Sequence, residues 1–242
     1  MRELGLLLPD WNLPASVRAV MTTREGGMSR GPYESFNLGA HVGDDDEAVH
    51  ANRRRLAARL GLVREPAWLR QVHGATVVRA ESVTEDTEAD ASWTDQPGVA
   101  CVVMVADCLP VLLASRDGER VAAAHAGWRG LAAGVLEETV RALGGGELTA
   151  WLGPAIGPDR FEVGPEVRDA FVARSPEHAQ AFRQGEGDRW LCDIYLLARR
   201  QLAALGVHDV HGGGFCTVTD SRFFSFRRDG VTGRMAALIW RE

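Results

Sequence analysis

The sequence is poor in cysteine, has no long hydrophobic run and carries no excess of basic residues. Its four cysteines are scattered and form no Cys-x-x-Cys pair, so a reducing compartment is expected rather than a disulfide scaffold. No stretch approaches the roughly 18 apolar residues of a membrane-spanning helix. The apolar run at residues 4–8 ends at Pro9 and is too short for a secretory signal. These absences predict a cytoplasmic protein.

The charge balance and the composition limit the partners and the fold. The formal net charge is −6, which gives no support for a nucleic acid or a membrane surface as partner, because both attract basic patches. Hydrophobic residues make up 45% of the chain, enough for a sizeable core. Because the sequence contains no linker, low-complexity tract or internal repeat, residues 1–242 are expected to form a single domain.

Apolar runs and turn signals predict the order of strands and helices. Val-rich runs bounded by turns are typical of buried strands, and apolar residues at helical spacing predict amphipathic helices. Strands are predicted over 17–23, 68–73, 76–80, 99–106, 110–114, 121–124, 148–152, 215–218, 223–227 and 234–240. A helix is predicted that starts at an N-cap among residues 44–46, carries its apolar positions over 48–60 and ends at Gly61, and further helices are predicted over 131–143, 166–174 and 193–205. The two types interleave irregularly, without a sustained βαβ rhythm, which indicates an α+β fold.

Three residues that can bind a soft metal lie at the ends of apolar segments. Cys108 follows the run at 99–106, His125 follows the run at 121–124, and His73 lies beside a glycine close to a third segment. Two imidazoles and one thiolate suit Zn²⁺, and also copper. Three protein ligands leave a fourth position open, as in catalytic zinc sites, where a bound water has a pKa of about 7.

The spacing alone leaves a second interpretation open. His73 lies 35 residues before Cys108, and Cys108 lies 17 residues before His125, and no standard short zinc motif has these gaps. In the second interpretation Cys108 is a small buried residue and the two histidines are satisfied turn residues. On these residues alone the two interpretations are equally open.

The segments around these residues resemble one protein family. QVHG, ADCLPVLL and AAHAGWRG, in this order, are similar to the signature of the YfiH family, also called the multicopper polyphenol oxidase or laccase-domain family. TREGGMSRGPYESFNLGAHVGDD and EADASWT resemble family segments that precede the cysteine, and GPAIGPDRFEVG, LCDI and FFSFRRDGVTGRMAALIW resemble later ones. The resemblance runs from about Thr22 to Ile239, nearly the whole chain.

The resemblance implies a fold, an activity and a set of ligands. The implied fold is one domain of packed mixed β-sheets flanked by helices. Carried onto this chain, the family's metal ligands and catalytic residues are His73, Cys108 and His125. The implied reactions are phosphorolysis of adenosine, inosine, guanosine and methylthioadenosine, and deamination of adenosine, with zinc as the metal. The family has also been called a copper polyphenol oxidase and linked to peptidoglycan-precursor editing.

Phosphorolysis requires an anion site, and the sequence offers candidates for substrate binding. Arg24, Arg53 and Arg129 are candidate phosphate ligands, and Asn37 is a candidate for contact with a base edge or a sugar. Each has an alternative role: a surface position for Arg24 and Arg53, a structural ion pair for Arg129, and a turn for Asn37. Asp107 is expected to face away from the metal, because successive side chains of a strand point to opposite faces.

Three other functions are also considered. A metal-free cysteine hydrolase would use Cys108 as nucleophile and His125 or His73 as base. A copper polyphenol oxidase is disfavoured, because multicopper oxidases need several more histidines than one three-ligand group and only seven histidines occur here. A metal-stabilised binding module would lose stability on chelation and turn over no nucleoside. The motifs of the zinc nucleobase deaminases, H-x-E and P-C-x-x-C, are absent, so a deaminase here would belong to another class.

Overall fold

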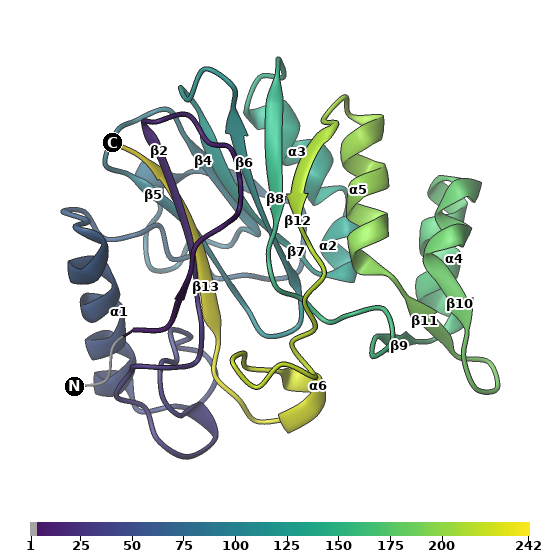
Figure 1. Ribbon diagram of the computed structural model, residues 1–242, viewed down its shortest axis with the longest axis horizontal. Coiled ribbons are helices and arrows are strands. Elements are labelled where there is room, and N and C mark those ends of the chain that lie inside the picture. The colour runs from purple at the N-terminus through teal and green to yellow at the C-terminus, as the bar shows by residue number, and fades with distance from the viewer. Residues whose placement is uncertain (1–3) are drawn as a thin grey trace.

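Two β-sheets lie face to face in the computed structural model, which describes residues 4–242 (Figure 1). The four-stranded sheet contains, in spatial order, β1 (Leu6–Leu7), β2 (Val17–Thr22), β13 (Met235–Arg241) and β5 (Ala100–Val105). The six-stranded sheet contains, in spatial order, β12 (Asp209–Gly212), β8 (Leu148–Leu152), β6 (Leu109–Ser115), β7 (Val121–Ala126), β4 (Ala91–Thr94) and β3 (Val77–Arg79). The first sheet is antiparallel, and the second is mixed because β12 and β3 pair in parallel with their neighbours.

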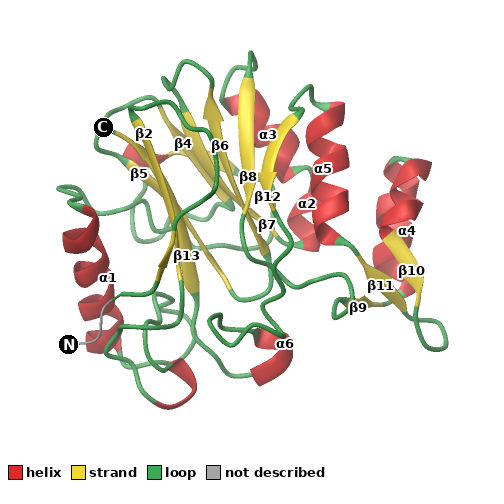
Figure 2. Ribbon diagram, viewed as in Figure 1, coloured by secondary structure: helices red, strands yellow, loops and turns green. Residues whose placement is uncertain are grey.

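Helices flank the two sheets on both outer sides (Figure 2). On the side of the four-stranded sheet lies α1 (Asp46–Leu60), and on the other side lie α2 (Trp128–Ala133), α3 (Val135–Ala142) and α5 (Ile194–Ala204). A small sheet of β10 (Phe182–Gln184), β11 (Trp190–Cys192) and β9 (Glu162–Val163) accompanies α4 (Pro165–Arg174), and α6 (Phe226–Asp229) precedes β13. The predicted α+β fold of packed mixed sheets flanked by helices is confirmed. No helix within residues 4–242 has the length and apolar character needed to span a membrane.

Alternation of side chains along the central strands builds three apolar layers. On β13, Ala237 and Ile239 pack between the two sheets, whereas Leu238 packs on the side of α1. On β6, Leu112 packs between the sheets, whereas Leu113 packs toward the helices on the opposite side. Because both faces of these strands are covered, nearly every position is apolar, and the strands appear in the sequence as the continuous runs that predicted them.

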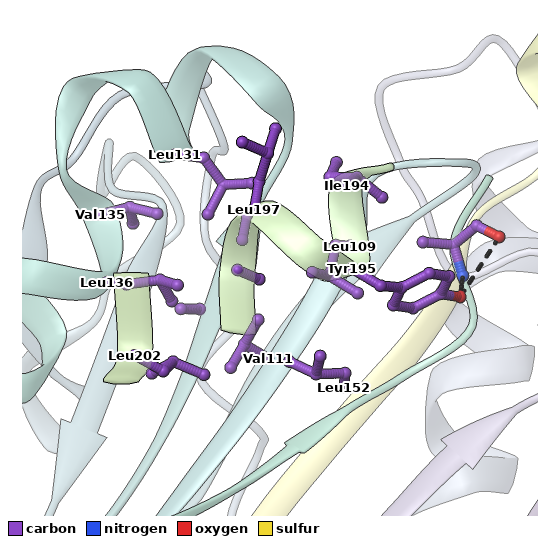
Figure 3. Close-up of a cluster of buried hydrophobic side chains, with 14 of the residues drawn as sticks. Leu109, Val111, Leu131, Val135, Leu136, Leu152, Ile194, Tyr195, Leu197 and Leu202 are labelled. Carbon is purple, nitrogen blue, oxygen red and sulfur yellow. Dashed lines mark hydrogen bonds between the residues drawn. The ribbon is translucent and has the colours of Figure 1, made fainter. Parts of the chain in front are cut away.

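Figure 3 shows the layer between the six-stranded sheet and its helices. Leu136 of α3 and Leu197 of α5 pack there against strand residues and are fully buried. Tyr195 is a polar member of this layer. Its hydroxyl oxygen accepts a hydrogen bond from the N–H of Ala155 at 2.8 Å and donates to the carbonyl of Phe215 at 3.1 Å. These bonds attach two loops to α5 without leaving a buried hydroxyl unpaired.

Helix ends follow the local signals with one interruption. The Asp45 side chain accepts a hydrogen bond from the N–H of Ala48 and caps α1, and Gly61 closes the helix in the left-handed region with φ 67°. The helix predicted over 131–143 is divided into α2 and α3 at Gly134, whose φ of 94° cannot continue a helix. The apolar stripe is kept, but the axis changes direction at this glycine.

Three predicted strands are not formed. The segment 223–227 contains no strand, because the Ser225 side chain accepts a hydrogen bond from the N–H of Arg228 and starts α6. The segment 68–73 makes one isolated bridge, between Arg70 and Glu88, and 215–218 is irregular chain that enters a turn. Conversely, the short strands β1, β4, β9, β10, β11 and β12 were not predicted.

Candidate metal centre

The pairing of β6 with β7 places Cys108 beside His125. The two strands are antiparallel, with Pro110 opposite His125 and Leu109 opposite Ala126. Cys108 immediately precedes β6, so its side chain lies at the edge of the sheet where β7 ends. The start of β6 and the end of β7 therefore lie at the same edge of the sheet, because the first residues of one antiparallel strand face the last residues of the other.

The carboxylate of Asp90 connects His125 to the loop that carries His73. Asp90 directly precedes β4, which pairs with β7, and its side chain is fully buried. Its Oδ1 lies 2.8 Å from Nδ1 of His125 and accepts the N–H of His73 at 2.9 Å. Its Oδ2 accepts the N–H groups of Gly74 at 2.7 Å and of Val72 at 3.2 Å. One carboxylate thus fixes the backbone of one candidate ligand and the ring of another.

These contacts explain the unusual backbone of His73 and set the tautomer of His125. His73 has a φ of 61°, a left-handed conformation that is uncommon outside glycine. Three successive N–H groups around it point to the Asp90 carboxylate, an anion-binding arrangement that stabilises the turn. Because an ionised carboxylate only accepts hydrogen bonds, Nδ1 of His125 carries a proton and Nε2 remains free to bind a metal.

The three candidate ligands converge on one point. The donor atoms of His73, Cys108 and His125 lie within 4.8 Å of one another, with Nε2 of His73 3.9 Å from Sγ of Cys108. The two imidazole rings meet edge to face, with centroids 4.8 Å apart. His73 is exposed, Cys108 is half-buried and His125 is buried. The centre is therefore closed on the side of the sheet and open to solvent on the side of His73.

Two residues next to the ligands have special backbone or packing requirements. A Cβ on Gly127 would lie 2.9 Å from Sγ of Cys108 and 3.5 Å from Cδ2 of His73, so a side chain there would press on two of the three ligands. Asp107 has a φ of 90°, and its carboxylate accepts the hydroxyl of Thr217 at 2.5 Å and the N–H of Arg227 at 2.6 Å. Its carboxylate is thus engaged with the 217–227 segment, and the strand alternation on which its predicted orientation rested does not extend to this residue.

The electrostatics of the group favour a thiolate. Burial opposes ionisation of Cys108, but the positive charge and hydrogen bonding of His125, with a smaller effect of His73, lower the thiol pKa to about 6. Burial likewise opposes the charged form of His125, but the Cys108 thiolate and the Asp90 carboxylate raise its pKa to about 9. Burial also acts against the ionised form of Asp90, yet its hydrogen bonds from His125 and Gly74 lower its pKa.

The donor set fits one soft divalent cation. A thiolate and two imidazoles are ligands of zinc and copper, and the polar surroundings support the charge that a bound cation brings. Metal-ligating histidines commonly donate a hydrogen bond from their second ring nitrogen to a carboxylate, as His125 does to Asp90. His73, Cys108 and His125 are the residues that would hold the ion.

The candidate substrate residues Asn37 and Arg53 lie in one region of the fold. Asn37 is fully buried, and its amide accepts from the N–H groups of Gly39 and Arg234 and donates to Asp44. Arg53 of α1 is half-buried, and its guanidinium lies over an indole ring 4.1 Å away. The structure thus shows a turn-organising role for Asn37 and a partly enclosed cation at Arg53.

Arg24 and Arg129 lie apart from these contacts. Arg24 is half-buried, donates to the carbonyl of Glu34 at 3.0 Å and lies over the ring of Phe224. Arg129 is exposed and lies over the ring of Trp128, and it forms no ion pair with any residue from 4 to 242. None of the four candidate substrate residues bonds directly to the three candidate ligands.

Sequence reasoning did not identify Asp90 as part of the site. The residue lies in the segment EADASWT, which carries the family resemblance, and it directly precedes a strand. That position was the available signal, because a polar residue at the end of a buried strand often carries function. Its partners lie 16 to 18 residues earlier and 35 residues later, so no local pattern revealed the contacts.

Known proteins share both the sequence and the fold. The family model described as multi-copper polyphenol oxidoreductase laccase matches residues 18–242. A Pseudomonas aeruginosa protein named purine nucleoside phosphorylase is 60% identical over 238 residues, which cover 97% of each chain. The Escherichia coli protein named purine nucleoside phosphorylase YfiH is 53% identical over 239 residues, which cover 97% of this chain and 98% of that protein.

Solved structures agree with this assignment. A Neisseria meningitidis protein superposes with a TM-score of 0.95 at 51% identity, over 98% of this chain and 99% of that one. YlmD from Geobacillus stearothermophilus superposes with a TM-score of 0.92 at 34% identity, over 100% and 98% of the two chains. On the matched sequence and the shared fold, this chain belongs to the YfiH family, the family of the multi-copper polyphenol oxidoreductase laccase model.

Proposed function

We propose that the protein is a zinc-dependent purine nucleoside enzyme. The proposed reactions are phosphorolysis of adenosine, inosine, guanosine and methylthioadenosine, and deamination of adenosine. The observation that carries the proposal is the convergence of His73, Cys108 and His125 at an open sheet edge. This group occurs in a chain 60% identical to a protein named purine nucleoside phosphorylase. The proposed partners are small molecules, purine nucleosides and phosphate, with no role for nucleic acid or a membrane.

The chain's own residues prepare the site in three ways. Cys108 contributes a thiolate, Asp90 holds the ring of His125 in one tautomer, and the same carboxylate holds the turn at His73. Positions fixed in advance cost no reorganisation at the moment of reaction. A zinc ion bound there would supply Lewis-acid polarisation and would lower the pKa of water.

Phosphorolysis exchanges one bond at the ribose. The bond between C1′ and the purine nitrogen breaks, and a phosphate oxygen forms the new bond to C1′. The purine leaves with the electron pair of the broken bond and takes up a proton at nitrogen, so the products are the free base and ribose 1-phosphate. The chain must hold the phosphate anion against the sugar, a task suited to the planar donors of Arg24, Arg53 or Arg129.

Deamination exchanges one bond at the base. The oxygen of water forms a bond to C6 of adenine, and the C6 amino group leaves as ammonia after taking up a proton. The two reacting bonds lie at different ends of the purine, so the two reactions require different placements of the nucleoside beside the exposed His73 side of the centre. Asn37 is proposed to contact the sugar or the base edge, which would require it to exchange some of its present hydrogen bonds.

A metal-free cysteine hydrolase is the second candidate, and a specific observation favours it. Asp90, His125 and Cys108 form a consecutive chain in which the thiol pKa is lowered to about 6 and the imidazole pKa is raised to about 9. An activated thiolate beside an imidazole oriented by a carboxylate is the arrangement of cysteine nucleophiles. In that case Cys108 would be alkylated readily, and the purified protein would contain no stoichiometric metal.

The deciding experiment combines metal analysis with product analysis. Wild type is incubated with adenosine and phosphate, and chromatography resolves inosine, adenine and hypoxanthine. We expect near-stoichiometric zinc and turnover in wild type, and loss of both in His73→Ala, Cys108→Ala and His125→Ala. Cys216→Ser is the matched control, because that half-buried thiol lies outside the group of ligands. Unchanged turnover in the three ligand variants would overturn the metal-centred proposal.

A further inference from the structure

Near the candidate metal centre, two arginine side chains contact the same loop. Arg53 of α1 donates from Nε to the carbonyl of Leu38 at 3.0 Å. Arg234, directly before β13, packs its stem against Gly39, where a Cβ would lie 2.8 Å from Cγ of the arginine. The loop containing Leu38 and Gly39 is therefore shared by two arginines that lie far apart in the sequence.

Both guanidinium groups are half-buried cations without an anionic partner. Among residues 4–242, neither Arg53 nor Arg234 has a carboxylate oxygen within 4.0 Å, whereas many of the other arginines form such ion pairs. Their remaining contacts are carbonyl oxygens, the sulfur of Met104 and aromatic faces. Burial lowers the pKa of both groups, which reflects the cost of enclosing their charge. Enclosed cations without partners are unusual unless an anion joins them.

Each guanidinium keeps a donor for that anion. Nη1 of Arg53 and Nη2 of Arg234 have no acceptor within the described part of the chain, and neither nitrogen is fully buried. Planar guanidinium donors match the oxygens of phosphate, which can accept two hydrogen bonds from one group.

His41 links this pair to the candidate metal centre. Partial enclosure is the largest cause that lowers the pKa of His41, followed by the charges of Arg234 and Arg53 and then by those of His125 and His73. The charge of Arg234 also interacts with Cys108. Contacts through Met104 place the pair next to the candidate metal centre: Nη2 of Arg53 lies 3.8 Å from the Met104 sulfur, and the side chain of Gln71, two residues before His73, bonds to the Met104 backbone at 2.7 and 2.8 Å.

We propose that Arg53 and Arg234, with His41 at their rim, form the subsite that holds inorganic phosphate beside the candidate metal centre. This inference rests on the proposed function for its choice of phosphate. It selects Arg53 from the three sequence candidates for phosphate, adds Arg234, which the sequence did not suggest, and includes His41 of the long loop. The anion would be held by fixed donors on one side of the nucleoside, while the base and sugar occupy the open side of the centre.

Equilibrium binding of inorganic phosphate to the purified holoprotein tests the subsite without turnover. Isothermal titration calorimetry compares wild type with Arg53→Gln, Arg234→Gln and the control Arg54→Gln, which removes an exposed arginine from the next position of the same helix. We expect the Kd for phosphate to rise at least tenfold in each of the first two variants, equivalent to about 1.4 kcal/mol. The control should bind like wild type.

Kinetics and charge-conserving variants separate a binding role from a structural one. In phosphorolysis the two Gln variants should raise the KM for phosphate and leave the KM for the nucleoside unchanged. Arg53→Lys and Arg234→Lys keep the charge and should bind phosphate more tightly than the Gln variants, even where a Gln substitution lowers the melting temperature. Deamination of adenosine, which consumes no phosphate, should be unaffected.

The outcomes distinguish this inference from the proposed function. Phosphate binding by both Gln variants within about twofold of wild type, or no binding of phosphate to wild type, overturns the subsite. Phosphate binding that depends on both arginines, in a protein that turns over no nucleoside, supports the subsite and overturns the proposed function.

Discussion

Replacement of Asp90 by asparagine tests how the candidate metal centre is organised. The carboxylate accepts four hydrogen bonds from two directions: His125 and His73 at Oδ1, and Gly74 and Val72 at Oδ2. An asparagine oxygen can replace only one of these two acceptors. The amide NH₂ then faces two N–H donors, or an N–H and an imidazole N–H, in a fully buried position.

The magnitude follows from the number of bonds lost. A hydrogen bond to a charged group contributes about 1.5–3 kcal/mol, so losing two such bonds costs about 3 kcal/mol or more. For a chain of this length each kcal/mol shifts the melting temperature by about 2–4 °C, so we expect a fall of about 6–12 °C in metal-free protein. Loss of the oriented Nδ1–H of His125 should also weaken zinc binding by about 10- to 100-fold, as is typical when a partner of a metal-ligating histidine is removed.

Thermal melting after chelation and a competition titration with zinc measure the two effects separately. Asp86→Asn is the matched control, because Asp86 is exposed on the same segment before β4 and should change neither quantity. A melting temperature of Asp90→Asn within about 2 °C of wild type would mean that the free energy of unfolding changed by no more than about 1 kcal/mol. Equal binding of zinc would mean that the metal ligands were unaffected. The carboxylate would then not organise the centre, and the argument from its four contacts would be wrong.

Three further outcomes are expected from single contacts. Gly127→Ala should lower zinc content and turnover at least tenfold with little loss of fold, since its Cβ would lie 2.9 Å from Sγ of Cys108; metal analysis of the purified variant measures this. Tyr195→Phe should destabilise the protein by about 1–3 kcal/mol in urea unfolding, because a buried N–H and a carbonyl lose their partner. Since burial raises the pKa of Cys101 to about 12, its thiol stays protonated between pH 7 and 9, and mass spectrometry after brief iodoacetamide treatment should find it unmodified. Cys216 should be alkylated under the same conditions, and Cys108 only after chelation; equal labelling of all thiols would contradict this ranking.

The central strands were predictable because burial on both faces leaves a strong signal. The runs at 99–106, 110–114 and 121–124 became β5, β6 and β7 within one or two residues. The short strands β9 to β12 lie in a small sheet or at a sheet edge. Strands in such places pair with segments far away in the sequence and contain few apolar residues, so they leave no clear local pattern. The strand predicted over 223–227 was wrong because a local helix cap outweighs the apolar pattern. Phe223 and Phe224 are buried as in a strand, but Phe226 is exposed, and the cap at Ser225 starts a helix there.

The candidate site was predictable in its ligands and not in its supports. Residue type and position at strand ends, together with the family resemblance, pointed to His73, Cys108 and His125. Asp90 and Arg234 left no comparable signal, because their roles depend on contacts with chain far away in sequence. Side-chain chemistry can be recognised locally, whereas hydrogen-bond partners and enclosed charges become visible only when the tertiary structure brings the segments together.

The donor groups in this structure also bear on the family's description as a multi-copper oxidoreductase. Within residues 4–242, one group of three His, Cys or acidic residues has the geometry to hold an ion. Two of the other histidines bond elsewhere: Nδ1 of His178 bonds to a backbone carbonyl of α4, and His211 pairs with Asp209 at the far edge of the six-stranded sheet. Oxidation of phenols at several coppers requires additional imidazoles close to the first group. The arrangement seen here suits chemistry at a single ion, which is what the proposed nucleoside reactions require.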